Sequence, residues 1–343
     1  MTNQRPNILL LYTGGTIGMV KDPKSAALKP FDFKKLLENI PELKLLDCDI
    51  QTISLKTPID SSNMQPVYWA EIATIIERYY QVFQGFVILH GSDTMSYSAA
   101  ALSFMLENLA KPVIFTGSQL PIGDLRTDAK ENLITSIQMA SLQRYGRAVI
   151  REVGLYFEYK LYRGNRTTKI NTEHFEAFAS LNYPVLAESG VNLNVNYDAL
   201  FQPNTRRKFT VHKNFASHVL LIKLFPGISE EILRPLFELE SVKGYVLETF
   251  GSGNTMTNSW FIDLLKSVIK RNLPIVNVTQ CAGGSVVMGQ YETSTKLKSI
   301  GVISGKDITT EAALAKMMYM LGEEVSPKTF RTIFETSLRG EMA

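Results

Sequence analysis

Residues 9–20, with the sequence LLLYTGGTIGMV, decide how this chain is expected to fold. The apolar run at 8–12 has the character of a strand that is buried on both faces of a parallel sheet. This strand breaks without a spacer into the TGGT segment at 13–16, where two glycines permit positive φ values and a close approach of the backbone. Two threonine hydroxyls flank that backbone. The stretch is therefore compatible with a tight strand–helix turn and with an active-site loop.

A dinucleotide-binding loop is the nearest competing interpretation of this stretch. Its fingerprint needs G-x-G-x-x-G after the first strand and an acidic residue about 20 positions further on. Gly15 and Gly18 match the last two glycines, but Thr13 occupies the place of the first. Asp47 and Asp49 come too late to serve as the acidic residue. The pattern disfavours a nucleotide cofactor.

The composition is that of an ordinary soluble protein with about two domains. The chain has 343 residues, 45% of them hydrophobic and 20% charged, with a net charge of +3. This small net charge predicts no nucleic-acid partner. The two cysteines, far apart in sequence, provide neither a disulfide framework nor metal-ligand spacing. Because no leader-like segment and no apolar run of about 18 residues is present, we expect a cytoplasmic protein without a membrane partner.

Apolar strands alternate with helices along the first half of the chain. The pattern predicts further strands at 50–55, 85–89, 112–115 and 153–159, and helices at 32–39, 66–79, 98–109 and 126–142. Most of these strands end in loops of Gly, Ser, Thr and Asp, which favours a doubly wound α/β fold. In such folds ligands bind beyond the carboxyl ends of the strands, so these polar loops are expected to share one pocket. The polar segment 21–29 is a candidate lid.

The second half repeats this alternation on a smaller scale. Strands at 218–224, 244–249 and 274–279, with helices at 229–239, 258–270, 310–321 and 327–338, predict a parallel sheet with crossover helices. Helical periodicity is lost just before this region, where Asn, Pro and basic residues accumulate. We therefore expect an N-terminal catalytic α/β domain with a mixed or parallel sheet at 1–192, a linker at 193–214, and a smaller C-terminal α/β domain at 215–343.

Converging hydroxyls, a carboxylate and a lysine are sufficient for acyl transfer without histidine, metal or cofactor. A threonine hydroxyl needs a base within hydrogen-bond reach, and a lysine can act as that base. Each residue also has a structural interpretation: Asp93 caps a helix, Lys169 is solvated, Ser61 and Ser62 belong to a loop, and His90 lies in the core. The convergence of these residues, more than any one of them, favours an enzyme.

The motifs together resemble the bacterial-type L-asparaginases, and most closely their cytoplasmic type I branch. The similarity covers residues 8–339. The segments that carry it are 11–18 (LYTGGTIG), 60–62 (DSS), 85–95 (GFVILHGSDTM), 116–119 (TGSQ), 161–169 (LYRGNRTTK) and 279–281 (TQC). The resemblance implies a large N-terminal α/β domain, a linker and a small flavodoxin-like C-terminal domain, and no cofactor or metal.

The resemblance also implies catalytic roles. Thr16 is the expected nucleophile, which takes the acyl group of L-asparagine. Ser92, Asp93 and Lys169 form the second, threonine-type triad, which transfers protons and activates the attacking water. Asp93 also helps to hold the α-amino group of the substrate.

The implied substrate-binding residues come from four loops. Gly15 belongs to the glycine turn whose amides stabilise an oxyanion, and Ser61 and Ser62 hold the α-carboxylate and α-amino groups. Ser118 contacts the side-chain amide through its backbone. Asn254 matches a residue that family members contribute to the neighbouring subunit, so a homodimer or homotetramer is expected.

Three positions depart from the family pattern. Ser92 stands where threonine is usual, which keeps the hydroxyl but loses χ1 stiffness. Leu28 lies near the position of a lid tyrosine that assists the nucleophile. Glu248 replaces an arginine that binds a second, regulatory asparagine in some type I enzymes. Because a carboxylate repels the effector's own carboxylate, we expect no allosteric activation of that kind.

The sequence therefore predicts an amidohydrolase that converts L-asparagine and water to L-aspartate and ammonia through an acyl-threonine intermediate. A glutaminase-asparaginase of broader specificity is one alternative. Glutamine has one methylene more than asparagine, and a pocket discriminates between substrates that differ by one methylene by only about 1–3 kcal/mol. A non-catalytic asparagine sensor on the same scaffold is another, although Thr16 and Lys169 are both present. A related transamidation subunit carries an added N-terminal domain, which this sequence is expected to lack.

Overall fold

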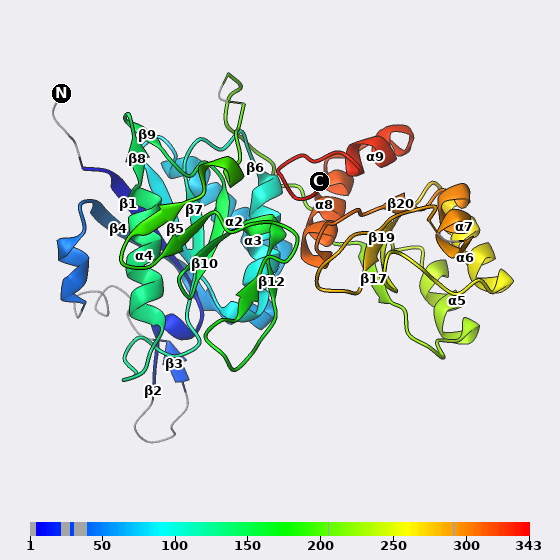
Figure 1. The fold of residues 1–343 in the computed structure, drawn as a ribbon, viewed down its shortest axis with the longest axis horizontal. Helices are drawn as coiled ribbons and strands as arrows, with labels where there is room; N and C mark the ends of the chain where they lie inside the picture. Colours follow the sequence, from blue (N-terminus) through cyan, green and yellow to red (C-terminus); the bar gives the residue numbers. More distant parts are fainter. Residues whose placement is uncertain (1–4, 22–27, 31–39, 205, 291) are drawn as a thin grey trace. The chain divides into compact units, whose positions relative to one another are not determined.

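The computed structural model describes residues 5–21, 28–30, 40–204, 206–290 and 292–343. The chain divides into two compact units, Met1–Lys213 and Asn214–Ala343 (Figure 1). The helix predicted at 32–39 and most of the candidate lid at 21–29 lie outside the described residues. In the part of the chain that is described, no helix is long and apolar enough to cross a membrane.

The first unit is built on an eight-stranded mixed sheet, which confirms the mixed or parallel sheet that the sequence predicts. Its strand order is β15-β14-β11-β10-β7-β5-β1-β4. The neighbours from β10 to β4 run parallel, and β11, β14 and β15 extend the sheet antiparallel. The strands are β1 (Asn7–Gly14), β4 (Asp49–Ile59), β5 (Gly85–Leu89), β7 (Val113–Thr116), β10 (Val153–Phe157), β11 (Lys160–Arg163), β14 (Ala187–Ser189) and β15 (Leu193–Val195).

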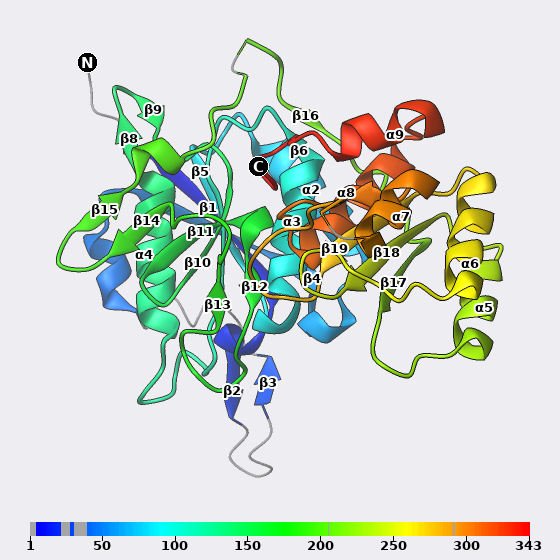
Figure 2. The same cartoon turned by 45° about the vertical axis from the view of Figure 1, so that its right-hand side comes forward.

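Helices cover both faces of this sheet, which explains why its central strands are apolar throughout. Ile8, Leu10 and Tyr12 of β1 share one buried cluster with Leu133 and Ile137 of α4. The alternate residues of β1 are buried against the other face, where α3 contacts β7 and β10 and packs beside α2 (Figure 1 and Figure 2). The helices are α2 (Pro66–Tyr79), α3 (Met95–Met105) and α4 (Ala129–Ser141).

Short pairings account for most differences from the predicted boundaries. The strand predicted at 153–159 ends at Phe157, because Glu158 and Tyr159 form a tight turn with φ values of 46° and 67°. The range 193–214, expected to be a linker, begins with β15 and contains β16 near its end. The minor elements are β2 (Met19–Lys21), β3 (Leu28–Pro30), β6 (Leu106–Glu107), β8 (Gln143–Arg144), β9 (Arg147–Ala148), β12 (Thr168–Lys169), β13 (Phe178–Ala179), β16 (Thr210–Val211), and the 3-10 helices η2 (Pro41–Leu45) and η6 (Tyr197–Ala199).

The second unit contains a four-stranded parallel sheet in the order β17-β18-β19-β20, which confirms the predicted parallel sheet. Three of its strands match the predicted strands closely, and β20 is additional because two residues are too few to show a pattern. The elements are β17 (Val219–Lys223), β18 (Gly244–Thr249), β19 (Ile275–Thr279), β20 (Ile303–Ser304), α5 (Glu230–Glu238), α6 (Ser259–Lys270), α7 (Glu292–Ile300), α8 (Thr310–Gly322) and α9 (Pro327–Phe334).

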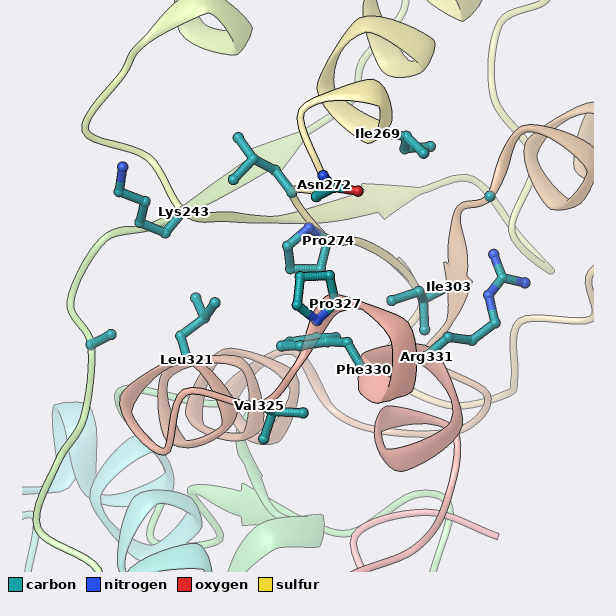
Figure 3. A pocket seen from close by; sticks show the side chains of 13 residues that line it. Lys243, Ile269, Asn272, Pro274, Ile303, Leu321, Val325, Pro327, Phe330 and Arg331 are labelled. Carbon is teal, nitrogen blue, oxygen red and sulfur yellow. The ribbon is translucent and has the colours of Figure 1, made fainter.

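A cavity of about 400 Å³ lies at the amino-terminal edge of this second sheet. Figure 3 shows Pro274, Pro327 and Phe330 around its centre, while the charged ends of Lys243 and Arg331 point away from it on two sides. The cavity therefore has an apolar wall, and it lies at the opposite strand ends from Glu248.

A fully buried ion pair joins α8 to the segment that follows α9. Lys316 Nζ lies 2.5 Å from Glu341 Oε1 and also donates to the carbonyl oxygens of Phe334 and Thr336, both at 2.7 Å. Burial lowers the pKa of Lys316, and the Glu341 carboxylate opposes this shift. Glu341 also accepts hydrogen bonds from the backbone N–H groups of Leu338 and Arg339. Its negative charge is therefore stabilised both by the lysine and by the backbone.

Breaking this pair is expected to destabilise the second unit strongly. Lys316→Met leaves the buried Glu341 carboxylate without its cation, so we expect the free energy of unfolding to fall by about 3–5 kcal/mol. Adding Glu341→Gln removes the stranded charge and keeps an acceptor for the backbone, so the double variant should recover at least about 1 kcal/mol. Urea unfolding followed by circular dichroism measures both changes. A loss below about 0.5 kcal/mol in Lys316→Met would contradict a stabilising role for the pair.

Candidate active site

Loops from four parallel strands meet at one edge of the first sheet. β1 pairs in parallel with β4 and β5, and β5 pairs in parallel with β7. The carboxyl ends of these strands therefore lie at the same edge, as the polar strand endings in the sequence suggest. Three of the loops continue as single 3-10 turns, η1 (Thr16–Gly18), η3 (Ser61–Asn63) and η4 (Ser92–Thr94).

Glycine backbone brings three of these loops into direct contact. Gly15 has a φ of 89°, and a Cβ atom added there would lie 2.5 Å from the backbone nitrogen of Gly91. A Cβ atom added at Gly91 would lie 2.5 Å from Ser61 Oγ. The Thr94 hydroxyl also donates to the backbone oxygen of Ser61 at 2.7 Å. No side chain larger than hydrogen fits at either glycine, so the loops of β1, β4 and β5 pack as one layer.

The two threonines of the TGGT segment have different surroundings. Thr13 is buried, and its hydroxyl donates to the carbonyl oxygen of Leu89 at 2.8 Å, which ties β1 to β5. Thr16 is the first residue of η1 and is only partly buried. Among the described residues, none forms a hydrogen bond with the Thr16 hydroxyl. Within the described part of the chain, the fold thus engages the hydroxyl of Thr13 in a hydrogen bond and does not engage that of Thr16.

Lys169 joins Ser92 and Asp93 in a hydrogen-bonded group. Lys169 is the last residue of β12, and its Nζ lies 2.9 Å from Ser92 Oγ and 2.6 Å from Asp93 Oδ1. The side chain of Lys169 is 13% exposed, whereas that of Asp93 is 64% exposed. The amine is thus enclosed while the carboxylate faces the open side of the loops. Lys169 is 77 positions from Ser92 and 76 from Asp93 in the sequence, and the fold brings it to both.

Gln119 completes this group and was not assigned a role from the sequence. Its Oε1 accepts a hydrogen bond from Ser92 Oγ at 3.1 Å, and its Nε2 donates to the carbonyl oxygens of Thr172 and His174. The Asp128 carboxylate accepts a hydrogen bond from the backbone N–H of Gln119 at 2.9 Å. In the sequence, the signal that indicates a functional role for Gln119 is its position directly after Ser118, in a polar loop at a strand end.

The expected substrate-binding serines lie in the loops after β4 and β7. Ser61 is buried beneath Gly91, and Ser62 is exposed. The Ser62 hydroxyl and backbone N–H donate to Asp60 at 2.7 and 3.0 Å, and these bonds lower the pKa of Asp60. Ser118 is buried and its hydroxyl donates to the carbonyl oxygen of Leu120 at 2.5 Å. A ligand contact through the backbone of Ser118 does not compete with that bond.

His90 is a buried structural residue behind the same loop. Its Nδ1 lies 2.7 Å from the carbonyl oxygen of Gly91, which can only accept, so Nδ1 carries the proton. Its Nε2 then accepts from the Ser98 hydroxyl at 2.9 Å, while Ser98 Oγ accepts from Trp69 Nε1 at 2.8 Å. These hydrogen bonds give both ring nitrogens of a neutral imidazole a partner. His90 therefore orients Gly91 and is not a general base.

This arrangement predicts that His90 destabilises the fold in acid. Burial lowers the pKa of His90 to about 4, below the value of about 6.5 in an unfolded chain. The unfolded chain therefore binds the proton first, and the free energy of unfolding falls as the pH is lowered from about 6.5 to about 4, by about 3 kcal/mol in total. His90→Asn keeps a donor near Gly91 but does not titrate. Urea unfolding at pH 7 and pH 4.5 measures the free energy of unfolding of both proteins. Between these pH values, that of the wild type should fall by about 2–3 kcal/mol more than that of the variant. An equal fall in the two proteins would contradict this.

Two predicted positions lie in the second unit. Asn254 follows β18 and forms a backbone bridge with Phe250, with bonds of 2.8 and 2.9 Å. Glu248 lies near the end of β18, where its carboxylate accepts from the Thr310 hydroxyl at 2.7 Å and lies 3.4 Å from Lys223 Nζ. The contribution of Asn254 to a site stays a prediction.

Leu28 is the first residue of β3 in the first unit and pairs with Lys21 of β2.

Comparison with known proteins identifies relatives along the whole chain. Residues 7–201 match the family model described as Asparaginase, N-terminal, and residues 218–334 match the Glutaminase/Asparaginase C-terminal domain. The chain is 40% identical to L-asparaginase 1 of Escherichia coli (strain K12) over 340 residues, covering 99% of this chain and 98% of that protein. The crystal structure of L-asparaginase I from Vibrio cholerae has a TM-score of 0.90 and 39% identity, with 99% of each chain covered. The thermostable L-asparaginase from Thermococcus kodakarensis has a TM-score of 0.86 and 30% identity, with 98% of this chain and 99% of that chain covered.

Proposed function

The chain belongs to the L-asparaginase family, and from this premise we propose that it hydrolyses the side-chain amide of L-asparagine to L-aspartate and ammonia. The observation that carries the proposal is the hydrogen-bonded group of Lys169, Ser92 and Asp93, held beside the glycine turn that ends in Thr16. This group brings an amine, a hydroxyl and a carboxylate within hydrogen-bond distance of one another, which supports the proposal.

The first half of the proposed reaction is acyl transfer to Thr16. Its Oγ attacks the side-chain carbonyl carbon, and the oxyanion is stabilised by backbone N–H groups of the glycine turn at Gly15. Collapse breaks the carbon–nitrogen bond, and the proton that leaves the threonine hydroxyl departs with the amide nitrogen as ammonia. The free hydroxyl of Thr16, with no described residue bonded to it, supports this role.

The second half is hydrolysis of the acyl-threonine ester. Lys169 accepts a proton through the Ser92 hydroxyl, so that a water molecule in contact with Ser92 gains nucleophilicity. The water oxygen bonds to the acyl carbon, the bond to Thr16 Oγ breaks, and the proton taken from the water passes from Lys169 to Thr16 Oγ as L-aspartate forms. Asp93 and Gln119 hold the lysine and the serine in position, which their bonds of 2.6 and 3.1 Å support.

Substrate recognition is proposed to use the loops after β4, β5 and β7. Ser61 and Ser62 bind the α-carboxylate and α-amino groups, and the exposed carboxylate of Asp93 pairs with the amine. The backbone of Ser118 contacts the side-chain amide. The packing of Ser61 on Gly91, and of Gly91 on Gly15, supports a pocket whose binding and reacting parts are adjacent.

Ammonia release from L-asparagine and from L-glutamine, measured side by side, tests the proposal. We expect kcat/KM for asparagine to exceed that for glutamine, with a glutaminase-asparaginase as the second candidate because one methylene discriminates by about 1–3 kcal/mol. Comparable kcat/KM values for the two substrates would favour that second candidate. Saturable asparagine binding without ammonia release would contradict the enzyme proposal and favour a sensor.

The rate is expected to depend hyperbolically on asparagine concentration. At the place where some type I enzymes bind a regulatory asparagine, Glu248 presents a carboxylate already engaged by Thr310 and Lys223. A second negative charge there repels the carboxylate of an effector. Initial rates across a wide asparagine range should give a Hill coefficient near 1. Sigmoidal kinetics that disappear on Thr168→Ala or Cys281→Ala would contradict this expectation.

The remaining expectations concern the oligomeric state, the location and the cofactor requirement of the enzyme. We infer a homodimer or homotetramer in which Asn254 of one subunit reaches the site of its neighbour, and a cytoplasmic location without cofactor or metal. The full-length similarity to type I asparaginases supports both inferences. Sedimentation velocity combined with the activity of Asn254→Ala tests the assembly, since a monomer with full activity would exclude a shared site.

A further inference from the structure

Figure 1 and Figure 2 show the hairpin of β8 and β9 in the first unit. Two adjoining cavities are lined by residues of this hairpin. One has a volume of about 270 Å³, and its lining includes Arg144, Arg147, Arg151 and Tyr197. The other has a volume of about 410 Å³, and its lining includes Lys111, Arg147 and Arg151. Because Arg147 and Arg151 line both cavities, we treat Arg144, Arg147 and Arg151 as one arginine cluster.

The hairpin places two members of the arginine cluster directly opposite each other. Arg144 and Arg147 are paired across β8 and β9, on either side of a turn at Tyr145 and Gly146 with φ values of 54° and 70°. These values fit a type I′ turn, which sets the register of the pair. Like charges directly opposite in an antiparallel pair are destabilising. An anion bound between the two guanidinium groups removes that repulsion.

Two aromatic rings lie beside one guanidinium group of the cluster. The Arg144 guanidinium carbon lies 5.4 Å from the ring centroid of Tyr145 and 5.4 Å from that of Tyr197. Tyr197 belongs to η6, so this contact also ties the hairpin to a distant part of the chain. A guanidinium over an aromatic ring keeps its N–H edge free for bidentate bonds to an oxyanion. The contacts of Arg144 are therefore compatible with an anion bound along that edge.

Arg151 has an unused donor in the same place. Its Nη2 donates to Gln202 Oε1 at 2.5 Å, which fixes the side chain. Its Nε is buried and has no acceptor among the described residues. A buried N–H group without an acceptor is unfavourable, so an incoming oxygen atom that reaches it is stabilised.

We propose that the arginine cluster binds a small phosphate-bearing anion, such as pyrophosphate or a phosphate ester. None of the described residues that line either cavity is acidic, so nothing in the described wall neutralises the three guanidinium groups. A phosphate group carries up to two charges and several acceptor oxygens, and it matches several guanidinium forks better than a single carboxylate does. The two volumes are within or close to the range of small-molecule sites.

The proposed site is separate from the candidate active site. Lys111 and Arg151 come just before β7 and β10, at the amino ends of these strands. The residues proposed to act on asparagine follow the carboxyl ends of the parallel strands. The two sites therefore occupy opposite edges of one sheet, and the anion site does not depend on the proposed function.

Isothermal titration calorimetry with pyrophosphate at constant ionic strength tests the proposal. We expect saturable binding to the full chain, and at least tenfold weaker binding in the double variant Arg144→Gln/Arg147→Gln, because two charge-assisted contacts are lost. The matched control is Arg206→Gln/Arg207→Gln, which removes two charges from the basic run at 206–208 of the same unit. The control should bind within twofold of wild type, and both variants should keep the wild-type circular dichroism spectrum.

Four results would overturn the proposal. The first is an absence of saturable binding to the wild-type chain, and the second is equal weakening in both double variants, which would indicate diffuse charge only. The third is tighter binding of an aspartate-rich peptide than of pyrophosphate, which would identify an acidic protein segment as the ligand. The fourth is dissociation of an oligomer by Arg144→Gln/Arg147→Gln in sedimentation velocity, which would assign the cluster to a subunit interface.

Discussion

Thr16→Ala is expected to lower kcat for ammonia release by about four to six orders of magnitude, the range seen when the nucleophile of a covalent hydrolase is removed. The variant loses the only protein atom proposed to bond to the acyl carbon, so covalent catalysis stops. Folding should be unaffected, because no described residue bonds to that hydroxyl and the side chain is only partly buried. A coupled ammonia assay and urea unfolding measure the two properties separately.

Thr16→Ser is the matched control, because it restores a hydroxyl at the same position. It should retain measurable turnover, and denaturation of the quenched enzyme should trap an acyl adduct on residue 16 in Thr16→Ser and wild type alone. Thr13→Ala should behave differently, losing stability through the lost bond to Leu89 while keeping the chemistry. A Thr16→Ala enzyme with more than about 1% of the wild-type kcat would exclude Thr16 as the nucleophile.

Lys169→Met is expected to lower kcat by about two to four orders of magnitude, the usual effect of removing a general base. Methionine keeps much of the stem volume while removing the amine that contacts Ser92 and Asp93. If the amine acts mainly on the attacking water, deacylation slows more than acylation. The acyl-threonine adduct should then accumulate during turnover, and rapid quenching with mass spectrometry can measure it.

Lys160→Met is the matched control for this change. Lys160 lies in the same unit, is more exposed, and pairs at 3.7 Å with Glu176, to which no catalytic role is assigned. Its loss should change kcat by less than about twofold, as expected for a surface ion pair. Equal effects of the two substitutions would contradict a catalytic role for Lys169. A Lys169→Met variant that is slow but accumulates no adduct would place the lysine in acylation instead.

The sequence was most informative where apolar strands end abruptly in polar residues. β1, β5 and β18 lie within one or two residues of their predicted bounds, because each is a buried run closed by Gly, Ser or Thr. β11, β14 and β15 were missed, since each has four residues or fewer and packs at the antiparallel side of the sheet. Pairing partners decide such strands, and a short segment carries no periodic signal of its partner.

The sequence predicted that polar loops form a site, but it predicted only part of the contacts between the residues of that site. Strand endings alone indicated that polar loops converge, but no spacing rule connects Lys169 with Ser92, which lie 77 positions apart. The family resemblance supplied that connection. Gln119 was overlooked because an amide has no distinctive chemistry in a sequence, although its two-sided hydrogen bonding is clear in three dimensions. The core interpretation of His90 agrees with its burial, and its hydrogen bonds with Gly91 and Ser98 explain it.

The contact of Gly15 with Gly91, and of Gly91 with Ser61, has a consequence for how this pocket can be altered. Loops packed this closely against glycine cannot be lengthened or shifted one at a time, because a displacement of one loop is transmitted to its neighbour. We therefore expect an engineered change of pocket shape to come from side chains at the rim, from segments outside this layer, or from a joint movement of all three loops.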